Sequence, residues 1–118
     1  MGVIIIPTVY KYRYTTGPIS VGENADNIRV VLLNNGTKSH KAVIKIYNLD
    51  PSPKKLVFNE TFNISPGSKA GTEYIPSFNY FEVQILADSA VVLAWVGGRS
   101  GNENLVGNVV LHSELVRL

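Results

Sequence analysis

Cysteine is absent from the sequence, and tryptophan and methionine each occur only once. Without cysteine the chain cannot form a disulfide, a thiolate zinc site or a cysteine nucleophile. Charge is also scarce, because 11 basic and 9 acidic residues leave a formal net charge of +2. This balance predicts neither nucleic acid nor an anionic membrane surface as an electrostatic partner. No run approaches the roughly 20 apolar residues of a membrane-spanning helix, so we expect no membrane insertion.

Residue patterns that would support catalysis or metal binding are also missing. The two histidines, His40 and His112, belong to no His-x-His or His-Glu-x-x-His pattern. In His112-Ser113-Glu114, strand alternation would place the serine on the opposite face from its neighbours, which excludes a catalytic triad. Gly97-Gly98-x-x-Gly101 lies between two strand-like runs and predicts a hairpin loop, not a phosphate site. We therefore expect a protein that is not an enzyme and has no cofactor and no metal.

Short apolar runs separated by turn residues fill most of the chain. The clearest pair flanks Asn35-Gly36, a dipeptide typical of a tight reversal between consecutive strands. We expect strands at 8–14, 27–33, 41–47, 55–64, 72–75, 80–87, 91–96 and 105–118, the last either continuous or broken at Gly107. No helical periodicity of useful length occurs. The sequence thus predicts an all-β fold, a single antiparallel β-sandwich of about eight strands, either jelly-roll or immunoglobulin-like. We expect residues 1–18 to form an N-terminal arm and first strand, and residues 19–118 the sandwich domain.

Two of the expected strands are apolar on both faces. Strand 27–33 places Val31 and Leu33 opposite its core residues, and 91–96 is a nearly continuous apolar run. This pattern is typical of a central strand covered on both sides or of an intersubunit contact. In the second run we expect Trp95 to be the largest core side chain, with a ligand platform as the alternative.

The N-terminus carries an isolated apolar segment, Val3, Ile4, Ile5 and Ile6, that Pro7 separates from the first expected strand. No basic residue precedes it and no small-residue cleavage site follows, so it is not a signal peptide, and we expect synthesis in the cytoplasm. One hypothesis makes it an edge strand of its own sandwich. The other makes it an arm that adds to a sheet edge of a neighbouring copy. A contact of this kind that is not reciprocal would propagate into a ring or filament.

Three tyrosines alternate with basic residues near the start of the chain. Tyr10, Tyr12 and Tyr14 share one face of the expected strand, and Lys11 and Arg13 share the other. The rings could form a stacking platform for sugar rings or for single-stranded nucleic acid. Because the rings and the cations would lie on opposite faces, they could not serve one ligand together. Cross-strand aromatic packing is therefore the favoured interpretation.

Two resemblances add to these expectations. The run 30–47, followed by Ile64-Ser65-Pro66-Gly67 and Phe81-Glu82-Val83-Gln84-Ile85, resembles bacterial extracellular immunoglobulin-like adhesion modules. The N-terminal apolar extension, Asn104-Leu105-Val106 and the terminal run 110–115 are similar to small β-sandwich subunits of bacterial endospore surface appendages. That second resemblance implies a jelly-roll subunit at the spore surface whose N-terminal connector, here Met1 to about Pro18, attaches to neighbouring copies. Such subunits are typically cross-linked by cysteines, so a fibre of this chain would depend on strand addition and apolar packing.

The leading hypothesis is a structural protein whose partner is itself and which assembles into a filament or other oligomer through Val3–Ile6. The alternative is a ligand- or carbohydrate-binding module that uses Tyr10, Tyr12 and Tyr14 or the loop 97–104, with surface glycans as partners. The expected location is a cell or spore surface.

Overall fold

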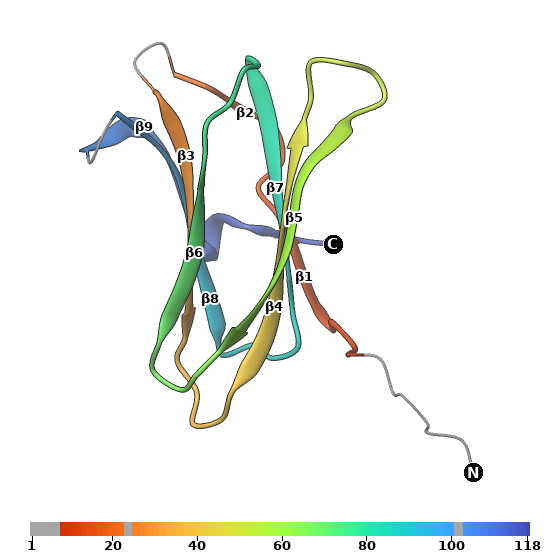
Figure 1. The fold of residues 1–118 in the computed structure, drawn as a ribbon, viewed down its shortest axis with the longest axis vertical. Helices are drawn as coiled ribbons and strands as arrows, with labels where there is room; N and C mark the ends of the chain where they lie inside the picture. The colour runs from red at the N-terminus through yellow and green to blue at the C-terminus, as the bar shows by residue number, and fades with distance from the viewer. Residues whose placement is uncertain (1–7, 23–24, 101–102) are drawn as a thin grey trace.

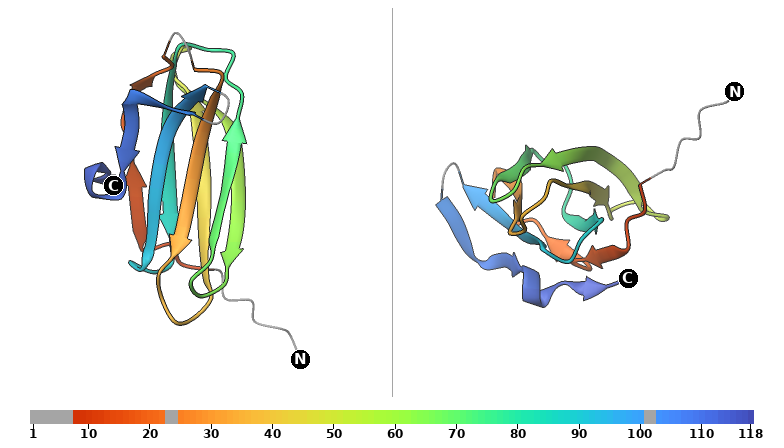
Figure 2. Two further views of the ribbon diagram at one scale, coloured as in Figure 1. Left: turned by 90° about the vertical axis from the view of Figure 1, so that its left-hand side faces the viewer. Right: turned by 90° about the horizontal axis from the view of Figure 1, so that it is seen from below.

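Two antiparallel β-sheets face each other across a hydrophobic core in the computed structural model (Figures 1 and 2). The structure describes residues 8–22, 25–100 and 103–118, with the backbone alone at 105–108. Within these ranges every element is a strand except the 3₁₀ turn η1, His112–Glu114. The all-β fold predicted from the apolar runs is therefore confirmed.

The larger sheet contains six strands in the order β10-β1-β7-β4-β5, with β2 also paired to β7. Their bounds are β1 Tyr12–Thr15, β2 Ile19–Ser20, β4 His40–Asn48, β5 Lys55–Ile64, β7 Tyr80–Ala87 and β10 Val116–Arg117. The smaller sheet has the order β6-β3-β8-β9. Its strands are β6 Lys69–Tyr74, β3 Asn27–Asn34, β8 Val92–Ser100 and β9 Glu103–Leu111.

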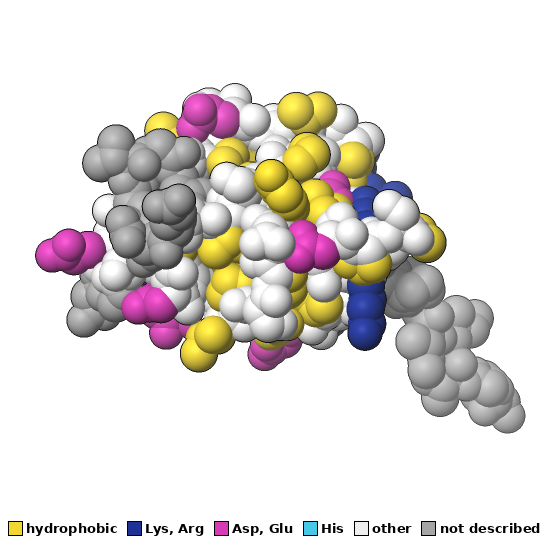
Figure 3. All heavy atoms as spheres, turned by 90° about the horizontal axis from the view of Figure 1, so that it is seen from above, with side chains coloured by type: hydrophobic (Ala, Val, Ile, Leu, Met, Phe, Trp, Pro, Cys, Tyr) yellow, Lys and Arg dark blue, Asp and Glu magenta, His cyan; other side chains and the backbone are white. Residues whose placement is uncertain are grey.

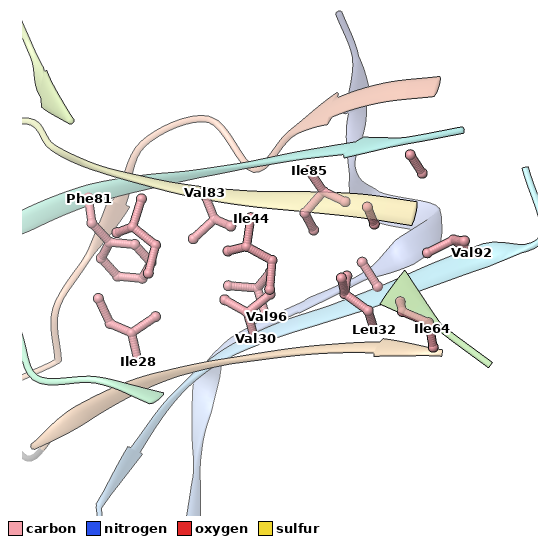
Figure 4. Packing of buried hydrophobic residues seen from close by; sticks show 14 residues of the cluster. Ile28, Val30, Leu32, Ile44, Ile64, Phe81, Val83, Ile85, Val92 and Val96 are labelled. Atoms are coloured by element: carbon pink, nitrogen blue, oxygen red, sulfur yellow. The ribbon is translucent and has the colours of Figure 1, made fainter. Parts of the chain in front are cut away.

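The core lies between the central strands β3 and β8 of one sheet and β4 and β7 of the other. Their alternate apolar side chains point toward one another across the gap (Figure 4). Phe81 is the largest side chain that is fully buried. The fully buried β-branched and leucine residues around it include Ile28, Val30, Leu32, Ile44, Ile46, Val83 and Val96.

The expectation that Trp95 is the largest core side chain was wrong. Its neighbours Ala94 and Val96 are buried in the core, whereas Trp95 is only half-buried and alternates to the outer face of β8. A continuous apolar run has no polar residues to mark its solvent side, so the pattern did not determine which parity points inward.

The link between β3 and β4 also differs from the expected tight reversal. These strands belong to different sheets, so the segment that contains Asn35-Gly36 crosses the sandwich and does not close a hairpin. In the described residues only Gly17 and Gly67 have positive φ. The buried Asn34 side chain holds the crossing: its amide nitrogen donates to the Lys38 and Ile64 carbonyls at 2.7 and 2.9 Å, and its oxygen accepts the Gly36 N–H at 2.9 Å. The hydrogen bonds of the buried Asn34 amide thus hold a crossing between the sheets where the Asn-Gly dipeptide predicted a hairpin turn.

The C-terminal run is broken at η1 and not at Gly107. β9 pairs with β8 in the four-stranded sheet, whereas β10 pairs with β1 in the six-stranded sheet. The chain end therefore crosses from one sheet to the other along one side of the sandwich (Figure 2). The last residue remains tied to the sheet, because the Leu118 N–H donates to the Arg13 carbonyl at 2.9 Å.

Candidate binding face of the four-stranded sheet

The outer face of the four-stranded sheet carries apolar side chains in adjacent cross-strand rows. One row aligns Gly71, Val31, Trp95 and Leu111 across β6, β3, β8 and β9. The next row aligns Lys69, Leu33 and Leu93. We call Val31, Leu33, Leu93, Trp95 and Leu111 the apolar outer face.

This face is open to solvent in the described part of the chain. Leu33, Leu93 and Leu111 are 38%, 36% and 50% exposed. Of the two explanations for a doubly apolar strand, coverage on both sides by the same chain is therefore not what the described residues provide. An intersubunit contact or a ligand remains to account for it.

The Trp95 indole lies over Gly97, its neighbour on the same face of β8. A Cβ atom added at Gly97 would stand 2.5 Å from Cη2 and 2.9 Å from Cζ2 of the indole. Any other residue at position 97 would therefore push the ring away from the sheet. The glycine thus leaves the space in which a large aromatic side chain lies along the strand.

Two adjoining hollows, of about 370 and 400 Å³, lie on the outer face, and the indole lines the second. Arg29, Val31 and Lys69 line both, and Trp95, Arg99 and Asn104 line the second. Glu73 lines the first hollow, where its Oε1 lies 2.5 Å from Nη1 of Arg29. Lys69 forms no ion pair within the described residues. The lining therefore holds three cations and one carboxylate around an aromatic ring.

The six-stranded sheet carries a polar cluster on its outer face, around the buried carboxylate of Glu82. Lys54 Nζ lies 2.6 Å from Oε1, and the Thr15 hydroxyl and the Gln84 amide both donate to Oε2. Burial raises the pKa of Glu82, but the hydrogen bonds from Lys54, Thr15 and Gln84 and the Lys54 charge outweigh it and lower the pKa below 4.5. Lys54 also lies over the Tyr47 ring, 4.5 Å from its centroid. The cluster satisfies its own charges and fastens the β4–β5 loop to the sheet.

The two histidines lie in separate, structural contacts. His40 Nδ1 is 3.0 Å from Asp88 Oδ1, and the other oxygen of Asp88 accepts the Lys41 N–H. The Ala94 N–H donates to Nδ1 of His112 at 3.1 Å. Burial lowers the pKa of His112 below 6.5. The described residues contain no group of three or more side chains that could hold a metal ion.

The site residues predicted from the sequence fall elsewhere. Val3, Ile4, Ile5 and Ile6 lie outside the described residues. Tyr10 precedes β1 and is half-buried. Tyr12 packs against the core with Arg117 4.9 Å from its ring centroid, and the Tyr14 ring meets His112 edge-on at 5.0 Å. These contacts are within the chain, and a ligand role for the three tyrosines stays a prediction.

The segment 97–104, predicted to be a loop, contributes residues to the second hollow, but its described part belongs to strands. Gly97 and Arg99 belong to β8 and Asn104 to β9, and Arg99 pairs with Asn104 across the strands. Sequence reasoning missed Arg29, Lys69 and the role of Gly97. The signal was present in the alternation: Trp95, Gly97 and Arg99 share one parity along β8, and Arg29, Val31 and Leu33 share one along β3.

Comparisons with protein-family models, with curated proteins and with solved structures found no match. In the described residues no helix is long and apolar enough to cross a membrane.

Proposed function

We propose that this chain is a non-enzymatic structural protein that assembles with copies of itself through strand addition by Val3–Ile6. The observation that carries the proposal is the open edge of β5. This ten-residue strand is the longest described. It ends its sheet, and β4 is its one strand partner among the residues that the structure describes. An unprotected edge strand presents unpaired backbone donors and acceptors that another strand can satisfy.

The sequence of β5 does little to block such pairing. It contains no proline or glycine, and its charged residues are Lys55 and Glu60. Its one irregularity, the register shift beside Ile46 and Tyr47, lies near its start and leaves Phe58–Ile64 in regular register with β4. Proteins usually protect edges with proline, charge or bulges, and this stretch has little of these devices. A donor of four β-branched or apolar residues fits within its length.

The apolar outer face supports the same proposal from a second direction. Assembled subunits bury apolar surface that a lone subunit leaves in water. The exposed leucines at 33, 93 and 111 belong to strands on the sheet opposite β5. Packing through this face would add a second contact to the non-reciprocal contact at β5, which by itself propagates into a ring or an open filament. The spore or cell surface remains the proposed location.

The test is the mass distribution of the full chain by light scattering, followed by negative-stain imaging. Deletion of residues 1–7 should leave folded monomers. Asn59→Lys with Asn63→Lys, which adds charge to the β5 edge, should also block assembly. The matched control is Ser65→Lys with Ser68→Lys, which adds the same charge in the following turn and should still assemble.

Each outcome addresses one part of the proposal. Assembly of the deleted form at the wild-type level would exclude the arm as donor. Assembly of the Asn59 and Asn63 variant would exclude β5 as acceptor. A full chain that stays a 12.9 kDa monomer at high concentration would exclude self-assembly altogether.

We further propose that the sandwich is closer to the immunoglobulin-like than to the jelly-roll type. In immunoglobulin domains the second strand pairs with the fifth in one sheet, and the third pairs with the sixth in the other. With β1 and β2 counted together as the first strand, β3 pairs with β6 and β4 pairs with β7 in this way. The departures are β8, which pairs with β3 and not with β7, β5, which pairs with β4 and not with β6, and β1 and β2, which pair with β7 and not with β3. An experimental structure with this strand order would support the assignment.

A second candidate function is ligand binding, and the hollow beside Trp95 favours it. An aromatic ring with convergent polar groups in a concave site is typical of small-ligand binding. The candidate site differs from the tyrosine platform expected from the sequence. A glycan array that shows saturable binding, lost in Trp95→Ala and retained in Tyr12→Ala, would support this location. If Tyr12→Ala loses glycan binding and Trp95→Ala keeps it, the binding site lies on the first strand and not beside Trp95.

A further inference from the structure

We propose that the hollow lined by Arg29, Lys69, Trp95, Arg99 and Asn104 binds an acidic glycan, with a uronic acid ring stacked on the indole. This inference rests on the second candidate function, ligand binding. It is independent of strand addition at β5 but competes with subunit packing for the apolar outer face. It assigns both a site and a chemical class of ligand.

The orientation of the indole supports a flat, partly apolar ligand. The far end of the Trp95 indole lies over Gly97, and the half-buried ring lines the second hollow, where a ligand can reach it. A pyranose ring presents C–H bonds on one face and hydroxyl groups at its edge. Such a ring can stack on an indole while its edge remains available for hydrogen bonds. Asn104, which lines the same hollow, offers an amide donor and acceptor for those hydroxyl groups.

The charges around the ring favour a carboxylate on the sugar. Three cations line the two hollows against one carboxylate, Glu73. Glu73 is engaged by Arg29 at 2.5 Å, whereas Lys69 forms no ion pair among the described residues. A cation beside an apolar platform gives a carboxylate a charge-assisted hydrogen bond that a neutral sugar cannot form. Lys69 is therefore the specificity residue and Trp95 the stacking residue.

The dimensions fit a short stretch of sugar and disfavour nucleic acid. A volume of about 400 Å³ lies near the lower end of ligand pockets, roughly 300–1,000 Å³. Single-stranded nucleic acid sites combine a basic groove along the backbone with several stacked bases. This chain has a net charge of only +2, and Figure 3, which looks onto one end of the sandwich, shows several acidic side chains spread over that end. One indole and one lysine without an ion pair among the described residues suit a single acidic ring better.

The experiment measures binding per protomer of the full chain by isothermal titration calorimetry. The probes are hexamers of galacturonate, of mannuronate and of glucuronate-containing hyaluronan, with methyl-esterified galacturonate as the uncharged match and a dT hexamer as the nucleic acid. At least one uronate should bind, and esterification should weaken binding at least roughly tenfold, the effect of losing one charge-assisted hydrogen bond.

Variants then separate the two roles. Lys69→Ala should weaken acid binding several-fold and leave the ester unchanged, whereas Trp95→Ala should abolish binding of both. Trp95→Phe should retain part of the affinity and guards against a folding defect. Lys55→Ala removes an exposed lysine from β5 in the other sheet and should bind like the wild type.

The failures are distinguishable. Equal affinity for the acid and the ester, with loss in Trp95→Ala, would overturn the acidic class and leave carbohydrate binding in place. Tighter binding of dT than of any uronate would replace the glycan with nucleic acid. No binding of any probe, together with a blank glycan array, would overturn this inference and the ligand-binding function together.

Discussion

The outer faces of the two sheets treat their side chains in opposite ways. On the six-stranded sheet, the buried Glu82 carboxylate accepts hydrogen bonds from Lys54, Thr15 and Gln84. Its charge is therefore matched within the chain. On the four-stranded sheet, Leu33 and Leu93 are exposed beside Trp95, and Lys69 has no ion-pair partner among the described residues. The charged cluster on the first face is matched within the chain, whereas the second face leaves adjacent apolar side chains exposed among the described residues.

This difference indicates where an external contact belongs. A satisfied polar cluster resists change, because a new partner must compete with existing hydrogen bonds. Covering an apolar face is favourable: it lowers the free energy by about 25 cal/mol for each Å² of apolar area removed from solvent. Glycan binding and the packing of subunits through the apolar outer face therefore use the four-stranded sheet. Strand addition uses the β5 edge of the other sheet, and none of these contacts involves the Glu82 cluster.

The largest loss of stability is expected from a substitution in the core that both sheets share. It gives the scale against which substitutions on the outer faces are compared. Phe81→Ala should lower the free energy of unfolding by about 3–5 kcal/mol, through lost burial and the cavity that remains. Trp95→Ala on the outer face should cost about 1 kcal/mol or less, although it removes the larger side chain. Urea denaturation of both variants measures the difference. Equal losses would mean that Trp95 has a core role.

The next effect concerns the complete face. Lys54→Met should lower the free energy of unfolding by about 1–3 kcal/mol, because it leaves a buried carboxylate without its cation. Lys55→Met, the neighbouring exposed lysine, should change it by less than about 0.5 kcal/mol. Thermal unfolding at neutral pH compares the two. Similar small changes in both variants would show that Glu82 does not depend on Lys54.

The sequence predicted the class of fold because alternation is a local property. The runs at 27–33, 41–47 and 80–87 appear as β3, β4 and β7, with their expected inner residues buried. The assignment of strands to sheets could not be predicted, because pairing depends on contacts distant in the chain. Asn34 shows this: its amide joins Lys38 and Ile64, and so directs β4 into the other sheet.

The candidate site was less accessible to sequence reasoning for a related reason. Its members come from β3, β6, β8 and β9, which become neighbours only after strand order is fixed. Trp95 was recognised as an important residue but was placed on the wrong face. Alternation shows which residues share a face of a strand, but it does not show which face is the outer one. Arg29, Trp95 and Arg99 could therefore be placed outside only once the inner face was known.

The contribution of the Glu82 cluster to stability should depend on pH in the acid range. The folded pKa of Glu82 lies below its ordinary value of 4.5, so as pH falls through about 4.5 the unfolded chain takes up this proton before the folded chain does. The stability that the carboxylate contributes is therefore present above pH 4.5 and lost below it. Glu82→Gln should show a shallower fall in melting temperature between pH 5 and 3 than the wild type. Parallel curves would contradict the lowered pKa.

The smallest effect is expected on the other side of the molecule, at His112. Its Nδ1 accepts the Ala94 N–H of β8, so the neutral ring fits this contact and a proton on Nδ1 would break it. Burial lowers the pKa of His112 below 6.5, and the unfolded chain therefore binds the proton first as pH falls from about 6.5. The contribution is fully present above pH 6.5 and is lost as pH falls from there through the folded pKa. His112→Asn, which keeps an acceptor but does not titrate, should flatten the melting temperature between pH 7 and 5.5. If wild type and variant show the same slope in that range, the four-stranded sheet has no acid-sensitive contact at Ala94, and its acid response belongs with the carboxylates alone.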